Sequence, residues 1–127
     1  MHKTLRKKIE PEFNKASKLW QEGKTAEAAR IFRRLNQEFP NQPAILGMLG
    51  AIHFTKGDYV ASLEYYQRVV NLSPKSELAS RAYYHSLLRN ERYDEALAEA
   101  TRFVKQNGLT KEYEEIMAEL DDAGIFG

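Results

Sequence analysis

Hydrophobic positions recur along the chain at helical spacing, in segments that short polar runs interrupt. Between residues 59 and 70 the apolar side chains fall three or four positions apart, which places them on one face of an α-helix. A polar turn at residues 56–58 precedes this segment. Pro74 follows it, and a proline biases the residue before it away from the helical conformation. The pattern predicts an all-α protein.

The same residue types also recur at intervals of 34. Gly23 and Gly57 both stand in turns, and Pro40 and Pro74 both follow helical segments. Other columns at this spacing are Thr25, Tyr59 and Tyr93; Ala28, Ser62 and Ala96; Phe32 and Tyr66; and Leu35, Val69 and Phe103. A period of 34 residues is typical of repeats built from two helices. The repeats are predicted at 9–42, 43–76 and 77–110.

Small residues within the predicted helices have a packing reason. Two antiparallel helices approach closely only where a small side chain faces a large one. Such positions are Ala16 and Gly50 in first helices, and Ala28, Ser62 and Ala96 in second helices. The third unit departs from this pattern with Tyr84 at a small position and Ala100 at an aromatic one. It also has Glu91 in place of the turn glycine, and we expect Asn90 to supply the left-handed backbone there.

This pattern resembles the tetratricopeptide repeat (TPR), whose signature runs W-x2-L-G-x2-Y, then A-x3-F, then P. The middle unit matches it best, with Leu46, Leu49, Gly50, His53, Ser62, Tyr66 and Pro74. The three units cover 102 of the 127 residues. The resemblance implies an α-solenoid of three antiparallel helix–turn–helix units and a C-terminal capping helix. That is about seven helices in a right-handed superhelix.

The segments outside the repeats carry opposite charges. Residues 1–8 form a basic N-terminal extension of net charge +4, whereas residues 111–127 sum to −5. Residues 111–123 are predicted to form an acidic amphipathic capping helix with Thr110 as N-cap, and 124–127 a tail. The apolar face of this helix is formed by Tyr113, Ile116, Met117 and Leu120.

Composition and chemistry narrow the function classes. The net charge of the whole chain is +1, which gives no argument for an anionic partner. The absence of cysteine excludes disulfides, thiolate metal sites and a cysteine nucleophile. His53 and His85 lie in neighbouring units, but no set of three or four ligands surrounds them. We expect no enzyme activity, metal or cofactor.

No targeting or membrane segment is apparent. The basic residues near the start are followed by a polar stretch at residues 9–12, whereas a secretory signal needs an apolar core. The longest uncharged run, residues 39–55, contains two prolines and is too short to span a bilayer. We expect a cytoplasmic protein without membrane contact.

A solenoid of this kind lines its concave side with the first helix of each unit. The resemblance implies a partner-binding groove formed by Phe13, Ser17, Trp20, Gly47, Met48, Ala51, Phe54, Leu78, Arg81, Ala82, His85, Leu88 and Arg89. Residues 43–54 carry no formal charge, and such a segment must be buried on all sides or bind something. We expect an apolar groove for a peptide or amphipathic helix of a partner protein. The alternative is that this segment is only the centre of the core.

TPR domains that hold the acidic tails of chaperones use a clamp of basic and amide residues. The matching positions here hold Phe13, Ser17, Met48, Leu78 and Ala82, none of which is Lys, Arg or Asn. We therefore expect no such carboxylate clamp. Arg81 and Arg89 are offset from it, free either to meet an acidic group at one end of a ligand or to lie in solvent.

Three alternatives to an interaction adaptor stay open. The oppositely charged ends would allow a self-associating structural repeat, that is, a homo-oligomer. Small TPR proteins also serve as dedicated chaperones or neutralising partners of one protein. Nucleic-acid binding is a weaker alternative, because the ten cations among residues 1–34 accompany no base-reading motif.

Overall fold

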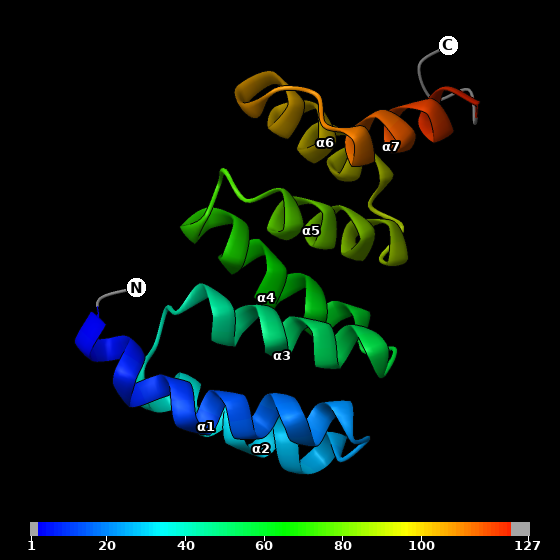
Figure 1. Ribbon diagram of the computed structural model, residues 1–127. Coiled ribbons are helices and arrows are strands. Elements are labelled where there is room, and N and C mark those ends of the chain that lie inside the picture. The colour runs from blue at the N-terminus through cyan, green and yellow to red at the C-terminus, as the bar shows by residue number, and fades with distance from the viewer. Residues whose placement is uncertain (1–2, 123–127) are drawn as a thin grey trace.

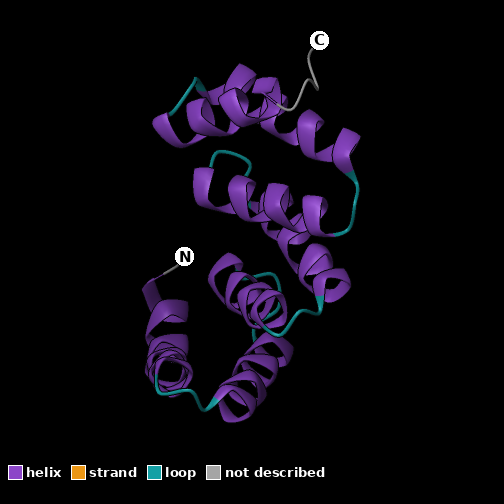
Figure 2. Ribbon diagram, turned by 90° about the vertical axis from the view of Figure 1, so that its right-hand side faces the viewer, coloured by secondary structure: helices purple, strands orange, loops and turns teal. Residues whose placement is uncertain are grey.

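The computed structural model describes residues 3–122, which form seven helices and no strand (Figure 1). The helices are α1 (Lys3–Gln21), α2 (Thr25–Glu38), α3 (Pro43–Thr55), α4 (Tyr59–Leu72), α5 (Glu77–Arg89), α6 (Tyr93–Asn107) and α7 (Lys111–Asp122). Consecutive helices pair as α1–α2, α3–α4 and α5–α6, the pairs stack in a row, and α7 covers the last pair (Figures 1 and 2). The predicted all-α solenoid is confirmed. The predicted tail at 124–127 and the last residue of the predicted capping helix lie outside the described residues.

The turns between paired helices share a left-handed residue at one repeat position. Gly23 and Gly57 have φ angles of 82° and 83°, and Glu91 occupies the same column with φ 59°. The expectation for Asn90 was wrong, since its φ is −94°. The side chain of Asn90 stabilises the turn instead, because its Nδ2 donates to the carbonyl of Ser86 at 2.7 Å and to that of Tyr59 at 3.0 Å. This residue therefore ties the end of α5 to the start of α4.

Most of the basic extension continues the first helix, because α1 begins at Lys3. The reason lies in its apolar residues. Ile9 is 2% exposed, and Leu5 packs against the same core cluster. One face of this extended helix is thus covered by the protein, while its lysines remain exposed.

The core follows the stacking of the helix pairs. One buried cluster joins α1, α2 and α3, and a second joins α4 to α7. The small residues expected at close approaches are buried: Ala16, Gly50, Ala28, Ser62 and Ala96. Because each pair contacts the next through such clusters, every helix keeps a defined side toward its neighbours.

The cap α7 is held by its apolar face and by buried polar groups. Tyr113, Ile116 and Leu120 are buried, and Thr110 Oγ1 accepts from the backbone N–H of Tyr113 at 3.2 Å, as the N-cap prediction required. The Ser80 hydroxyl donates to Glu99 at 2.6 Å and is hydrogen-bonded to the Tyr113 hydroxyl. This network satisfies a nearly buried carboxylate where α5, α6 and α7 meet.

Within residues 3–122, no helix is long and apolar enough to cross a membrane.

Candidate functional site

Helix α3 is apolar all round because its sides meet three different surroundings. Ile45, Leu49 and Ile52 are buried in the cluster with α1 and α2. Leu46 is buried in the cluster with α4 and α5. The remaining side holds only small or flexible side chains, and its members Gly47, Met48 and Ala51 are half-buried. Two sides therefore belong to the core, and one opens toward a hollow.

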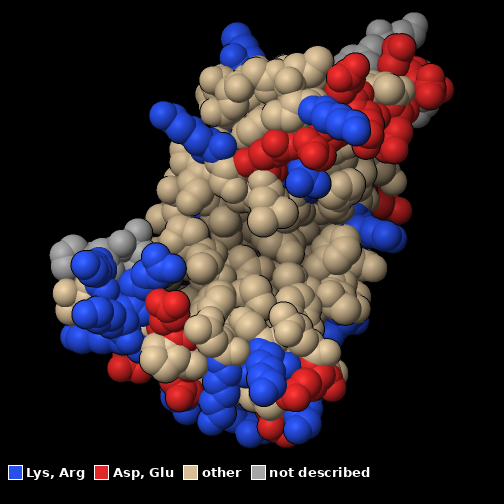
Figure 3. Space-filling model, in the orientation of Figure 1, with Lys and Arg blue, Asp and Glu red and all other residues tan. Residues whose placement is uncertain are grey.

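This hollow, which we call the apolar hollow, has a volume of about 450 Å³. Its lining contains no charged residue and comprises Phe13, Pro43, Ala44, Gly47, Met48, Ala51, Tyr66, Val69, Ser73, Ser76, Leu78, Ala79 and Ala82. Figure 3 shows the same property on a larger scale: basic side chains gather over the N-terminal helices, acidic ones over α7, and a largely uncharged band lies between them. The apolar hollow is of a size typical of ligand pockets.

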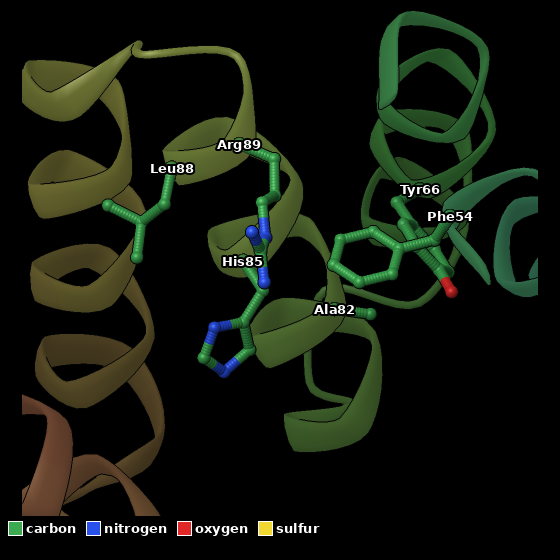
Figure 4. A pocket seen from close by; sticks show the side chains of 6 residues that line it. All are labelled: Phe54, Tyr66, Ala82, His85, Leu88 and Arg89. Atoms are coloured by element: carbon green, nitrogen blue, oxygen red, sulfur yellow. The ribbon is translucent and has the colours of Figure 1, made fainter. Parts of the chain in front are cut away.

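A second hollow, the basic hollow, lies toward the C-terminal ends of α3 and α5. It has a volume of about 600 Å³ and is lined by Phe54, Tyr66, Ala82, His85, Leu88 and Arg89 (Figure 4). Tyr66 and Ala82 line both hollows. The two hollows are therefore adjacent, and we refer to them together as the groove, which is apolar along α3 and has Arg89 at its other end.

Most of the predicted groove residues come together around these hollows. The apolar hollow includes Phe13, Gly47, Met48, Ala51, Leu78 and Ala82, and the basic hollow includes Phe54, Ala82, His85, Leu88 and Arg89. Ser17, Trp20 and Arg81 line neither. Trp20 packs against the cluster of α1, α2 and α3 instead. Arg81 stands one turn before His85 on the same side of α5, but only His85 and Arg89 line the basic hollow.

Sequence reasoning missed the contribution of α4 and of the connection between α4 and α5. Tyr66, Val69, Ser73 and Ser76 all line the apolar hollow. The sequence analysis places Tyr66 only in a repeat column with Phe32 and not in the groove. The sequence feature that could have indicated this position is the tyrosine hydroxyl, because a tyrosine in place of phenylalanine often occurs where one end of an apolar site is open to water. Burial raises the pKa of Tyr66 to about 12.

The two arginines of α5 have different partners. Arg81 Nε lies 3.5 Å from Glu77 Oε1, so this side chain pairs within its own helix. The Arg89 guanidinium lies over two rings, 5.9 Å from the centroid of Phe54 and 5.5 Å from that of Tyr59. Neither arginine is simply solvated, and only Arg89 reaches the groove.

The surroundings of His85 favour its uncharged form more than those of an ordinary histidine do. Its pKa is lowered first by burial and then by the positive charges of Arg81 and Arg89, against a smaller opposing effect of Glu119. His53 lies elsewhere and stacks on Tyr65 with ring centroids 5.6 Å apart. Among residues 3–122 no group of three or more His, Asp or Glu side chains is arranged to hold a metal ion.

Comparison with protein families gives one match. A family model described as tetratricopeptide repeat matches residues 13–77, slightly more than half of the chain. A comparison with curated proteins finds no match.

Solved structures share the fold. The chain is 24% identical to MamA 41-end from Desulfovibrio magneticus RS-1, with a TM-score of 0.69 over 78% of this chain, and it spans 56% of that structure. The first TPR of Spaghetti (RPAP3) bound to an HSP90 peptide gives 15% identity and a TM-score of 0.79, covering 92% of this chain and 93% of that one. The Yersinia enterocolitica type III secretion chaperone SycD, in complex with a peptide of the translocator YopD, is 18% identical to this chain. Its TM-score is 0.75, and the match covers 91% of this chain and 88% of that one.

Proposed function

The chain belongs to the tetratricopeptide repeat family, and from this premise we propose that it is a non-catalytic protein-interaction module. It holds an apolar peptide or helix of a partner protein in the groove along α3. The observation that carries this proposal is the free side of α3, where Gly47, Met48 and Ala51 line a hollow without a charged residue.

The chemistry of the lining supports an apolar ligand. Methionine and small side chains adapt to the shape of a ligand, and Phe13 and Leu78 add apolar walls. Leu78 is 72% exposed, so its side chain is available to a ligand at the edge of the hollow. Burial of such side chains is the main driving force of association.

The same lining disfavours a strongly acidic tail as ligand. The five positions that match the carboxylate clamp hold no Lys, Arg or Asn. Two structures of similar fold bear peptides, an HSP90 peptide in the Spaghetti structure and a YopD peptide in the SycD structure. By analogy, this chain would use the same kind of surface with a different chemistry.

The test is a selection of randomised twelve-residue peptides displayed on phage against the whole chain. Selected peptides are synthesised, and their Kd values are measured by fluorescence anisotropy with the parent chain, Met48→Asp and Ala51→Glu. We expect apolar peptides whose binding falls at least about tenfold in both variants, because a carboxylate buried against an apolar ligand loses its hydration without gaining a partner.

A matched control is Gln67→Asp, which adds the same charge at an exposed position of α4 outside both hollows. Circular dichroism confirms that each variant folds. Peptides that bind Met48→Asp and Ala51→Glu as strongly as the parent chain would contradict the proposal.

A second candidate is self-association through the ends. Basic side chains over α1 and α2 and acidic ones over α7 lie at opposite ends of the molecule (Figure 3). Such copies would stack head to tail. Sedimentation velocity tests this, because a contact between exposed charges weakens between low and high salt. A monomer at low salt and high concentration would exclude it.

A further inference from the structure

We propose that the partner segment carries an acidic side chain next to its apolar residues, and that its carboxylate binds in the basic hollow between Arg89 and His85. This inference rests on the proposed function and adds the direction in which the ligand lies in the groove. The apolar residues lie along α3, and the carboxylate lies at the C-terminal ends of α3 and α5.

The position of Arg89 is the first argument. Its guanidinium packs over the rings of Phe54 and Tyr59, and Figure 4 shows its side chain extending between Phe54 and His85. Stacking on aromatic rings holds the planar group in place while its edge nitrogens stay available for hydrogen bonds. A carboxylate matches this edge in a bidentate manner.

The backbone that bears Arg89 is also fixed. The next residue, Asn90, donates from its side chain to the carbonyl of Tyr59 at 3.0 Å. This bond holds the end of α5 against the start of α4, and Tyr59, whose carbonyl accepts it, also bears one of the two rings under Arg89. Asn90 is therefore a positioning residue for the arginine, and the hollow needs little rearrangement on binding.

The absence of an internal counterion is the second argument. Among the described residues, no Asp or Glu oxygen lies within ion-pair distance of Arg89, whereas Arg6, Arg34, Arg81, Arg92 and Arg102 each have one. The other arginines without such a partner, Arg30, Arg33 and Arg68, line neither hollow. His85 stands one turn before Arg89 on the same side of α5 and lines the same hollow. A ligand carboxylate would supply the negative charge that Arg89 lacks, and at His85 it would add to the effect of Glu119.

The position of the basic hollow next to the apolar hollow indicates the kind of ligand. Because Tyr66 and Ala82 line both hollows, one segment can fill the apolar hollow and reach Arg89 with a neighbouring residue. The clamp positions that would seize the free end of a chain hold apolar residues and a serine. We therefore assign the carboxylate to a Glu or Asp side chain and not to a chain terminus.

The experiment uses the selected phage peptides, synthesised with acetylated and amidated ends. Kd is measured for the parent chain, for Arg89→Gln and for Arg33→Gln, which removes an exposed arginine of α2 outside both hollows. Each peptide is also made with its acidic residue changed to glutamine or to lysine. We expect Arg89→Gln and the glutamine peptide each to weaken binding about tenfold, with little further loss when combined.

Two more readouts separate a contact from a structural effect. Arg89→Glu should bind the lysine peptide more tightly than the acidic one, which a merely destabilised groove would not do. The pKa of His85, followed by NMR in the parent chain, should rise when the acidic peptide binds and not when the glutamine peptide binds, since a nearby carboxylate favours the imidazolium.

The outcomes distinguish the two proposals. Peptides that lose binding in Met48→Asp but bind Arg89→Gln within about twofold of the parent chain would overturn this inference and leave the proposed function standing. Peptides that bind only with a free C-terminal carboxylate would also overturn it. A library that yields no peptide dependent on Met48 would overturn the proposed function, and this inference with it.

Discussion

The backbone of Gly50 lies directly against the ring of Tyr66. A β-carbon at position 50 would come within 2.8 Å of Tyr66 Cε1 and 3.0 Å of Cδ1, closer than carbon atoms pack. The glycine therefore lets α3 and α4 approach and sets the position of the ring. Because Tyr66 lines both hollows, this one contact also shapes the groove.

Gly50→Ala should lower the free energy of unfolding even though alanine favours helices. Overpacking costs about 1–3 kcal/mol, against a gain of about 1 kcal/mol in helix propensity. Gly47→Ala is the matched control in the same helix, because a β-carbon there meets nothing within 4 Å, and it should stabilise by up to about 1 kcal/mol. Urea unfolding of both variants measures the difference, and equal stabilisation would refute the role given to Tyr66.

The third unit reverses this arrangement of small and large residues. One repeat of 34 residues later, Tyr84 occupies the position that corresponds to Gly50, and Ala100 the position that corresponds to Tyr66. Tyr84 and Ala100 are buried in the same cluster, at 2% and 0% exposure. A change from small to large on one helix thus accompanies a change from large to small on its partner. Total volume between the helices is conserved, which is what a close-packed core requires.

The reversal predicts energetic coupling between the two positions. Tyr84→Ala alone should cost about 3–5 kcal/mol through a cavity, and Ala100→Phe alone should cost about 1–3 kcal/mol through overpacking. The double variant should lose at least about 1 kcal/mol less than the sum of the two. Thermal or urea unfolding of all four chains closes this cycle, and strictly additive losses would show that the positions are independent.

Glu91 holds a backbone conformation that suits glycine. Its φ of 59° matches the turn positions of Gly23 and Gly57, and a side chain in the left-handed region costs about 1–2 kcal/mol. Glu91→Gly should therefore stabilise the protein by about 1 kcal/mol. Glu91→Ala is the control, because it removes the same charge while keeping a β-carbon, and a similar gain from alanine would assign the effect to charge.

Asn90→Ala should destabilise the same turn through the loss of side-chain hydrogen bonds. The substitution removes the hydrogen bonds to the carbonyls of Ser86 and Tyr59, at a cost of about 1–2 kcal/mol. Hydrogen exchange should also quicken at the last turn of α5 and the first turn of α4, with little change in α1. Unchanged exchange at both sites would mean that Asn90 does not join these helices.

Stability should fall at alkaline pH because burial raises the pKa of several tyrosines, most of all Tyr66 and Tyr113. Burial raises the pKa of Tyr66 and of Tyr113 from 10.0 to about 12. The folded state favours the neutral phenol, so this contribution is complete below pH 10 and is lost as the pH rises through 12. Urea unfolding between pH 8 and 12 should show a decline that is shallower in the Tyr66→Phe, Tyr113→Phe double variant. An identical slope would contradict the assignment.

Much of this architecture could be predicted from the sequence because its causes are local. The interval of 34 residues, the spacing of apolar positions and the turn residues determine three helix pairs. Thr110 and the apolar stripe of the last segment determine α7 in the same way, since capping and amphipathicity act within a few residues. The uncharged character of α3 and the absence of the clamp residues were equally plain.

Only the tertiary structure decided how the candidate groove is composed. Tyr66 belongs to it, Ser17 and Trp20 do not, and Arg81 pairs with Glu77 while Arg89 turns to the groove. These assignments depend on how closely each helix approaches its neighbours and in which orientation. That approach is set by contacts between large and small side chains such as Tyr66 and Gly50, which lie on different helices and meet only when α4 packs against α3.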